Sequence, residues 1–185
     1  MKSSISIPKS VIPYVTKLHD DIDEYGHDYK GTKEVIGIRM EIDVTHIDTT
    51  DDTELRAYYG DEFEKRFQDE IYHYKQIQYS LLHKVKETAY FFPGQGTDSR
   101  KLITFSNDCI SSAQYMTRDH RSFLMVHMRS SDVRNLLPMD LHWLAKIQKT
   151  LDEIYKTGVE EQTLIVTIGS AHYYLSGGRS NEQTQ

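Results

Sequence analysis

Two alternating runs separated by a short polar segment limit most strongly how this chain can fold. Residues 111–116 form the first run, residues 117–121 are polar, and residues 123–128 form the second run. Successive side chains of a strand point to opposite faces of a sheet, so an alternation with period two predicts a strand. Two such runs joined by a polar turn predict a β-hairpin.

The polar end of the second run indicates a binding site for an anion. Arg129 is followed by two serines and Asp132, so a cation and two hydroxyl groups stand together at a strand end. A guanidinium group binds phosphate with paired hydrogen bonds, and hydroxyl groups add further donors. Cys109, the only cysteine in the chain, lies just before the first run. We therefore expect residues 109–140 to contain the functional site.

Length and composition indicate an ordinary globular protein. The chain has 185 residues, of which 38% are hydrophobic and 27% are charged, and this suits one domain with a sizeable core. We expect residues 11–175 to form that domain, with a mobile N-terminus at 1–10 and a disordered tail at 176–185. A single cysteine excludes an intrachain disulfide framework and a cysteine-rich zinc site.

Charge and hydropathy exclude some classes of partner. The formal net charge of −6 argues against nonspecific nucleic-acid binding, although it leaves room for a local basic pocket. No apolar run is long enough to span a bilayer and no signal peptide is visible, so we expect no membrane partner and a cytoplasmic location. Asp48, Asp51 and Asp52 lie together in residues 46–54 and resemble a site for a hard cation. Such acidic loops are usually just solvated, and we expect no metal.

Periodicity predicts the remaining elements. Apolar residues at helical spacing predict helices, and the last of these has Pro138 in its first turn and Gly158 at its end. Alternation, or a continuous β-branched run, predicts strands. The predicted helices are 11–25, 63–85 and 136–157. The other predicted strands are 34–44, 102–105 and 164–168, with a polar turn at 26–33 and a loop at 92–96.

The spacing around Cys109 carries a resemblance to a known family. Gln114 follows Cys109 after five residues, and Arg129 follows it after twenty. Further residues keep the same register without a gap: Ser130, Asp132, Pro138 and Asp140. In these positions the chain resembles the thymidylate synthase and pyrimidine-nucleotide hydroxymethylase superfamily. In that family a nucleophilic Cys precedes a strand that opens with Gln, and an Arg-Ser-x-Asp motif follows.

Shorter motifs elsewhere resemble the same family. Ser99-Arg100-Lys101 is similar to the family's Ser-Arg-Arg. His172 and Tyr174 match a His-x-Tyr pair that binds the sugar 3′-hydroxyl in the family. Tyr59-Gly60 is similar to the Tyr-Gly that follows a helical segment bearing a glutamate, which organises water and protons at the pyrimidine ring. That segment has no clear counterpart here, so the glutamate is not assigned.

The resemblance implies several contacts to phosphate. Arg129 and Ser130 would bind the 5′-phosphate of the nucleotide. Arg100 and Lys101 would cross a dimer interface to the phosphate bound by the partner subunit. Lys30 or Lys33, in the turn 26–33, would take the place of an arginine that reaches the phosphate in the family.

The resemblance also implies chemistry on a pyrimidine ring. The Cys109 thiolate would add to C6 and make C5 nucleophilic toward a one-carbon unit from methylenetetrahydrofolate, giving a methyl or hydroxymethyl product. Arg129 would favour the thiolate by its charge, Gln114 would hold the Cys or the pyrimidine, and Asp132 would lie at the O2 side of the ring. Asp140 stands where the cytidylate hydroxymethylases have Asp and the thymidylate synthases have Asn. It therefore favours a cytosine nucleotide over the simpler role of an Asp at a helix N-terminus.

The implied fold is α/β (α+β), with a mixed, mostly antiparallel sheet and helices on one face. In the family the other face of the sheet packs against a second copy and forms a homodimer. Two classes of function stay open. Cys109 favours an enzyme that methylates or hydroxymethylates C5 of a pyrimidine nucleotide. The family's glutamate-bearing segment and its segment that closes over folate have no clear counterpart here, which favours a catalytically silent nucleotide-binding protein or subunit. A structural protein without a ligand would leave the motif matches as coincidence, and we expect the enzyme.

Overall fold

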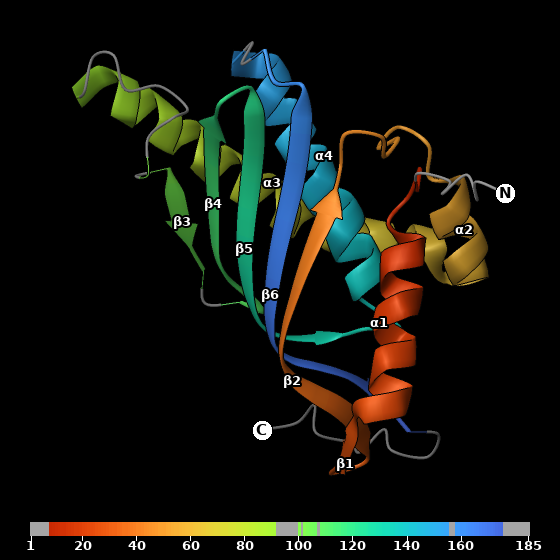
Figure 1. Ribbon diagram of the computed structural model, residues 1–185. Coiled ribbons are helices and arrows are strands. Elements are labelled where there is room, and N and C mark those ends of the chain that lie inside the picture. The colour runs from red at the N-terminus through yellow and green to blue at the C-terminus, as the bar shows by residue number, and fades with distance from the viewer. Residues whose placement is uncertain (1–7, 92–99, 101, 107, 156–157, 176–185) are drawn as a thin grey trace, which may run out of the picture.

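The computed structural model describes most of the chain. The described residues are 8–91, 100, 102–106, 108–155 and 158–175. Expectations for residues 1–7, the tail 176–185, the loop 92–96 and Lys101 therefore lie outside the described residues. The described part is a mixed α/β structure in which one sheet packs against a layer of helices (Figure 1).

The described strands form one six-stranded sheet in the order β1-β2-β6-β5-β4-β3. β5 and β6 pair in parallel, and the other neighbouring strands pair antiparallel, so the expected mixed, mostly antiparallel sheet is confirmed. The predicted hairpin is confirmed as β4 and β5. The strand bounds are β1 His27–Tyr29, β2 Thr32–Asp43, β3 Ile103–Phe105, β4 Ile110–Arg118, β5 Arg121–Asp132 and β6 Glu161–Tyr174.

The helices lie on one face of the sheet, where α3 and α4 run behind the strands and α1 lies beside β2 (Figure 1). The three predicted helices are confirmed as α1, α3 and α4. Periodicity does not predict α2, because seven residues give too few turns to establish a pattern. The helix bounds are α1 Ile12–Tyr25, α2 Thr53–Tyr59, the 3-10 helix η1 Gly60–Glu62, α3 Phe63–Phe91 and α4 Leu137–Tyr155.

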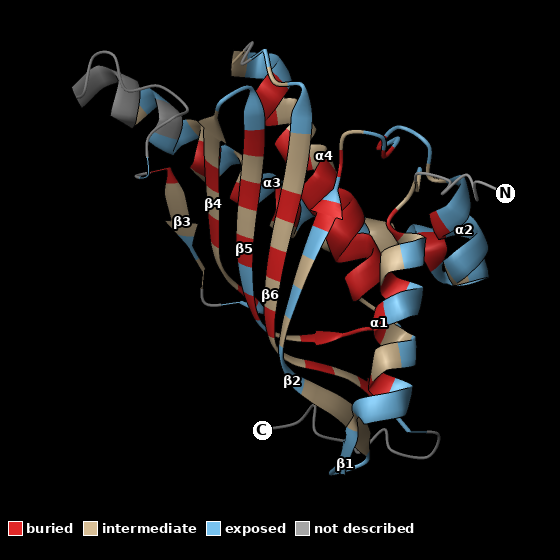
Figure 2. Ribbon diagram, viewed as in Figure 1, coloured by how far each residue is buried: buried red, intermediate tan, exposed pale blue. Residues whose placement is uncertain are grey.

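The core lies between the sheet and the helix layer. On β5, Leu124, Val126 and Met128 are buried and alternate with less buried residues. Figure 2 shows this alternation as bands along β5 and β6. The helical spacing of apolar residues in 136–157 also predicts Ile154 on the buried face of α4, and this prediction is wrong, since the residue is 51% exposed. It lies in the last turn of α4, which extends past the ends of the strands (Figure 1).

The turn that joins β4 to β5 has two residues and is shorter than the sequence predicts. Asp119 and His120 both have positive φ, 46° and 59°, which is the conformation of a type I′ turn and matches the twist of paired strands. The turn predicted at 117–121 is therefore too long, because its outer residues belong to β4 and β5. The turn predicted at 26–33 is also wrong in extent, since it contains the short strand β1.

The strand pairing is interrupted at one level across the sheet. β4 has a register shift between Ile110 and Ser112. On β6, Gly169 pairs neither with Arg129 of β5 nor with Gly37 of β2. A Cβ on Gly169 would come within 2.5 Å of the Arg129 carbonyl oxygen, so this close approach requires glycine. Figure 1 shows that the sheet bends here, and the ends of β5 and β6 turn toward α1.

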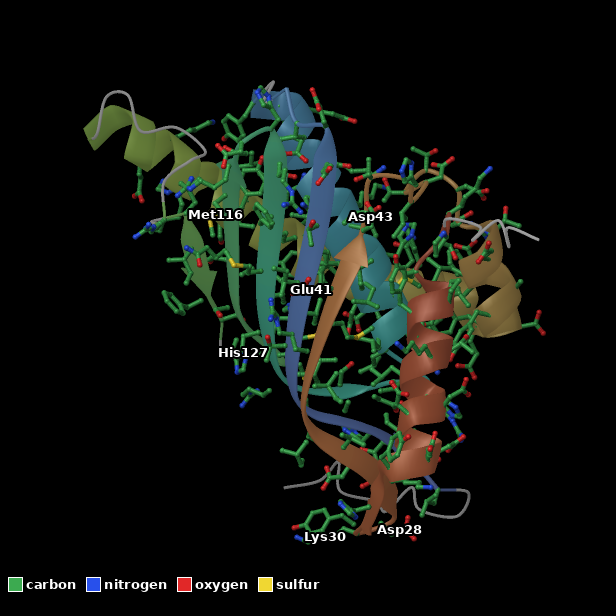
Figure 3. All side chains as sticks on the ribbon, in the orientation of Figure 1. Asp28, Lys30, Glu41, Asp43, Met116 and His127 are labelled. Atoms are coloured by element: carbon green, nitrogen blue, oxygen red, sulfur yellow. The ribbon has the colours of Figure 1, made fainter. Side chains whose placement is uncertain are left out.

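The sheet face opposite the helices has no described helix or strand packed on it. The strand registers place three rows of partly or fully exposed side chains on this open face, and Figure 3 labels Glu41, Met116 and His127 among them. The apolar members of the open face include Ile103, Phe105, Met116, Phe123, Met125 and Ile165. An antiparallel sheet can expose one face to water, and here the apolar side chains share that face with polar ones such as Arg39, Glu41 and His127.

A buried polar network fixes the far end of α4 to the sheet. The Asp152 carboxylate accepts hydrogen bonds from the Tyr115 hydroxyl at 2.5 Å, the Ser122 hydroxyl at 2.8 Å and the Gln162 amide at 2.6 Å. Gln148 in turn donates to the backbone carbonyl of Ser122 at 3.1 Å. Buried polar groups are tolerated when they are hydrogen-bonded in this way. The network therefore sets the position of α4, whose first turn borders the pocket described next.

Candidate functional site

A pocket of about 520 Å³ lies where the ends of β5 and β6 meet α3 and the start of α4. Small-molecule sites usually have volumes of roughly 300–1,000 Å³. Most of the lining residues carry a polar group, and Ile110, Met128 and Leu136 are the apolar ones. The pocket therefore suits one small polar ligand.

The pocket brings together seven of the residues that the sequence singles out. Strand pairing explains part of this, because parallel register sets Asp132 of β5 opposite His172 of β6. The bend at Gly169 turns both strand ends toward the helices. The seven residues are Cys109, Arg129, Ser130, Asp132, Asp140, His172 and Tyr174.

The other predicted site residues lie elsewhere. Gln114 faces a shallow hollow on the open face, next to Met125 and Ile165. Its side-chain amide donates to the Arg100 carbonyl oxygen at 2.7 Å, so Gln114 holds the segment before β3, and it is not among the residues that line the pocket of Cys109. Gln114 points away because strand side chains alternate, and its register position belongs to the open face. Arg100 is exposed and outside the pocket lining, and Lys101 lies outside the described residues.

Cys109 and Arg129 are joined through the backbone at the bend. The Arg129 N–H donates to the Cys109 carbonyl oxygen at 2.8 Å, and the Arg129 Nε donates to the Asp108 carbonyl oxygen at 3.1 Å. The Cys109 side chain is exposed to solvent. The register shift at the start of β4 thus sets an accessible thiol and a guanidinium group on the wall of the same pocket.

Asp132 caps the segment that leads into α4. Its carboxylate accepts hydrogen bonds from the backbone N–H groups of Arg134 and Asn135, both at 3.1 Å, and from the Asn135 side chain at 2.7 Å. This is the usual way in which an Asp satisfies free N–H groups before a helix. Asp132 lines the pocket, but its oxygens are already engaged, so its first role is to hold the turn between β5 and α4.

The end of β6 supplies two aromatic side chains to the pocket. Tyr173 points the other way, toward α1, where its ring stacks on His19 with centroids 4.9 Å apart and its hydroxyl hydrogen-bonds Asp23. Alternation along the strand then places His172 and Tyr174 on the pocket side, with ring centroids 5.7 Å apart. The contact of Tyr173 with α1 therefore fixes the direction of this His-x-Tyr pair.

Asp140 is a buried carboxyl group at the start of α4, only 6% exposed. The Tyr74 hydroxyl donates to its Oδ1 at 2.6 Å, and the Ser131 hydroxyl lies 3.5 Å from its Oδ2. Burial raises the pKa of Asp140 from 3.8 to about 7, against the opposing effect of the Tyr74 hydrogen bond. Asp140 can therefore be either a donor or an acceptor near neutral pH.

Three pocket residues on α3 were not identified from the sequence. Glu70, His73 and Tyr74 all line the pocket, and His73 Nδ1 lies 3.3 Å from the Asp108 carboxylate. Burial raises the pKa of the Glu70 carboxyl group above its ordinary value. The available signal was their spacing, because residues three and four apart share a helix face, and Tyr74 belongs to the apolar stripe that predicted α3.

Other charged residues singled out by the sequence do not line the pocket. Lys33 Nζ donates to the Asp23 carbonyl oxygen at 2.6 Å, and Lys30 lies over the Tyr29 ring. In the acidic loop, Asp48 accepts a hydrogen bond from the Thr50 hydroxyl at 2.7 Å. Such contacts are those of turn residues. Among the described residues, no group of three His, Cys, Asp or Glu is placed to hold a metal ion.

Comparison with known proteins adds no assignment. No protein-family model matches this chain, and no curated protein matches it. Within the described residues, no helix combines the length and the apolar character needed to cross a membrane. The pocket and its side chains therefore carry the functional argument.

Proposed function

We propose that this chain transfers a one-carbon unit to C5 of a pyrimidine nucleoside monophosphate and is a (d)CMP hydroxymethylase-type enzyme. One observation carries this proposal. A single pocket contains the chain's only thiol, a guanidinium group, serine hydroxyls, a buried carboxyl group and a His-x-Tyr pair. These are the groups needed to hold a phosphate, a sugar and a base around a nucleophile.

Arg129 and Ser130 form the proposed phosphate subsite. A guanidinium group binds two phosphate oxygens at once, and a hydroxyl group donates to a third. His172 and Tyr174 would bind the sugar hydroxyl at the end of β6. Asp140 would bind the base, because an ionised carboxylate accepts hydrogen bonds from the 4-amino group of cytosine.

Cys109 would act as the nucleophile. Its thiolate adds to C6, and the electron pair of the C5=C6 bond moves onto C5, which becomes able to attack an electrophilic carbon. Arg129 lines the same pocket and would hold the phosphate while the sulfur reaches the ring. The exposed position of Cys109 beside the pocket leaves the sulfur accessible to the ring.

Methylenetetrahydrofolate is the proposed one-carbon donor. Its pterin ring would pack on an apolar side chain near the thiol, and Leu136 is the apolar lining residue that is partly exposed. When bound, the folate supplies a carbon at the oxidation level of formaldehyde. The residues of this chain bind and orient the nucleotide beside that carbon.

A homodimer through the open face is part of the proposal. The open face carries partly exposed apolar side chains, including Phe123, Met125 and Ile165, and such surfaces commonly mark protein interfaces. In this arrangement Arg100, which precedes the edge strand β3, would reach the phosphate bound by the partner subunit, and the same role is proposed for Lys101.

A catalytically silent nucleotide-binding protein is the second candidate. It is favoured by the hydrogen bonds that already engage Asp132 and Asp140 within the chain. A carboxylate that is fully occupied can shape a pocket without taking part in chemistry. The two candidates share the nucleotide and differ in the role of Cys109.

The distinguishing experiment is tritium release from C5-labelled dCMP, CMP and dUMP, with and without methylenetetrahydrofolate. We expect release from a cytosine nucleotide by the wild type, slow without methylenetetrahydrofolate and faster with it, and none by Cys109→Ala. Release only from dUMP would overturn the assignment of cytosine to Asp140 but keep the chemistry. If the nucleotides bind and none releases tritium, the silent binder is the better description.

A further inference from the structure

One face of α3 borders the pocket and carries a carboxylate that none of the roles above uses. Glu70, His73 and Tyr74 are three and four residues apart, so they lie on the same side of the helix, and all three line the pocket. No hydrogen bond from another described residue holds the Glu70 carboxylate. Asp132 and Asp140, the other pocket carboxyl groups on β5 and α4, are both engaged.

Two contacts fix this face of α3 relative to the reacting groups. Tyr74 donates to Asp140 at 2.6 Å, which ties the helix to the proposed base-binding carboxyl group. His73 lies 3.3 Å from the carboxylate of Asp108, the residue directly before Cys109. Glu70 stands one helical turn before both His73 and Tyr74, on the face that these two contacts direct into the pocket.

The chemistry of the pyrimidine ring assigns a position to Glu70. C5 lies between C4 and C6 in the ring. If Asp140 binds the substituent at C4 and Cys109 bonds C6, the wall between these two groups faces C5. Glu70 and Cys109 both lie near Tyr74, since the charges of both contribute to its raised pKa, after burial and the larger effect of Asp140.

We infer that the Glu70 carboxylate is the base that removes the proton from C5. This inference rests on the proposed function, since it requires a nucleotide whose C6 is bonded to Cys109. A partly buried carboxylate with a raised pKa is better matched to this proton transfer near neutral pH than an ordinary glutamate. Glu70 would thus serve the proton-handling role that the sequence leaves without a residue.

The step can be followed without any one-carbon donor. The Cys109 thiolate forms the C6–S bond, the C5=C6 electron pair moves to C5, and C5 takes a proton from solvent. Glu70 then removes the original C5 proton, the electron pair re-forms the C5=C6 bond, and the C6–S bond breaks to release the thiolate. The net result is exchange of the C5 hydrogen with solvent, with no oxidant, reductant or second substrate.

The test is C5 exchange of dCMP in D₂O, followed by loss of the H5 signal in the proton NMR spectrum. The variants are Glu70→Gln, Glu70→Asp and the matched control Asp69→Asn, which removes an exposed carboxylate from the neighbouring position of α3. We expect exchange to fall roughly 100-fold in Glu70→Gln, with partial retention in Glu70→Asp. Asp69→Asn should exchange at the wild-type rate.

Calorimetric dCMP titration accompanies the exchange assay, and Glu70→Gln should bind dCMP within about threefold of the wild type, since the change preserves shape. Equal exchange by Glu70→Gln and Asp69→Asn would overturn the inference and leave the proposed function intact. Absence of exchange in the wild type, with dCMP bound, would overturn the proposed thiolate addition, and the inference with it.

Discussion

Replacing Asp140 with Asn is expected to stabilise the protein, and to do so more strongly at pH 8 than at pH 5. The Asp140 carboxyl group is buried at the start of α4 and hydrogen-bonded to Tyr74. Asn has nearly the same shape and still accepts the Tyr74 hydrogen bond, but it has no charge to bury. The variant therefore removes the cost of ionising this group inside the fold.

The size of the effect follows from the pKa of Asp140, which burial raises from 3.8 to about 7. Well below pH 4 the group is protonated in both the folded and the unfolded chain, so it does not change the free energy of unfolding. Between the two pKa values the unfolded chain ionises first, so stability falls by about 1.4 kcal/mol per pH unit. Above pH 7 the group is ionised in both states, so the loss in free energy of unfolding no longer grows with pH. From pH 5 to pH 8 the wild type should lose about 2.5 kcal/mol relative to the variant.

Urea unfolding at the two pH values measures this difference. Wild type, Asp140→Asn and the control Asp69→Asn would be compared at pH 5 and pH 8, each by its free energy of unfolding. The gap between Asp140→Asn and the wild type should widen at pH 8, whereas Asp69→Asn should follow the wild type at both. A gap that is the same at both pH values would refute the account of Asp140 as a buried, late-ionising group.

Three further changes test other parts of the structure. Tyr115→Phe removes a hydrogen bond to the buried Asp152 carboxylate, and urea unfolding should show a loss of about 2 kcal/mol. Gly169→Ala forces a Cβ against the Arg129 carbonyl oxygen, so we expect a loss of roughly 1–3 kcal/mol and weaker dCMP binding by calorimetry. Met125→Asp places a charge on the open face, and sedimentation should show monomers where the wild type forms the proposed dimer.

Each of these changes has a result that would count against it. Tyr72→Phe, at a residue that is 68% exposed, is the control for Tyr115→Phe and should leave stability unchanged. An equal loss of stability in both variants would mean that the hydrogen bond to Asp152 is not what stabilises the fold. Unaltered stability in Gly169→Ala would mean that the bend does not need glycine. Lys75→Asp, on an exposed part of α3, is the control for Met125→Asp and should not affect assembly. A wild type that sediments as a monomer would contradict the proposed dimer.

Local patterns were sufficient to predict most elements of the fold. Alternation in β4, β5 and β2 and the apolar stripes of α1, α3 and α4 persist over enough residues to identify each element. The turn at Asp119 and His120 was predicted too long, because polar residues at a strand end look the same as turn residues in a sequence. Strand β1 is three residues long and exposed throughout, so it leaves no pattern to read.

The candidate site was predicted best where strand pairing decides it. Arg129, Asp132 and His172 lie in one pocket because β5 and β6 are neighbours that bend at the same level. Gln114 lies elsewhere because its side chain alternates to the other face of the sheet. Glu70 was missed because its place in the pocket depends on how α3 packs against the sheet, and a helical pattern reveals the buried face but not what borders it.

The most direct test of a nucleotide pocket is the affinity of wild type and Arg129→Ala for dCMP and for deoxycytidine, measured by calorimetry. The two ligands differ only in the phosphate group that Arg129 is proposed to bind. A charge-assisted contact of about 1.5–3 kcal/mol corresponds to roughly 10–100-fold in affinity. The account predicts that the wild type prefers dCMP by about this factor and that Arg129→Ala loses most of the preference. Equal affinity of the wild type for both ligands, or an undiminished preference in Arg129→Ala, would contradict it.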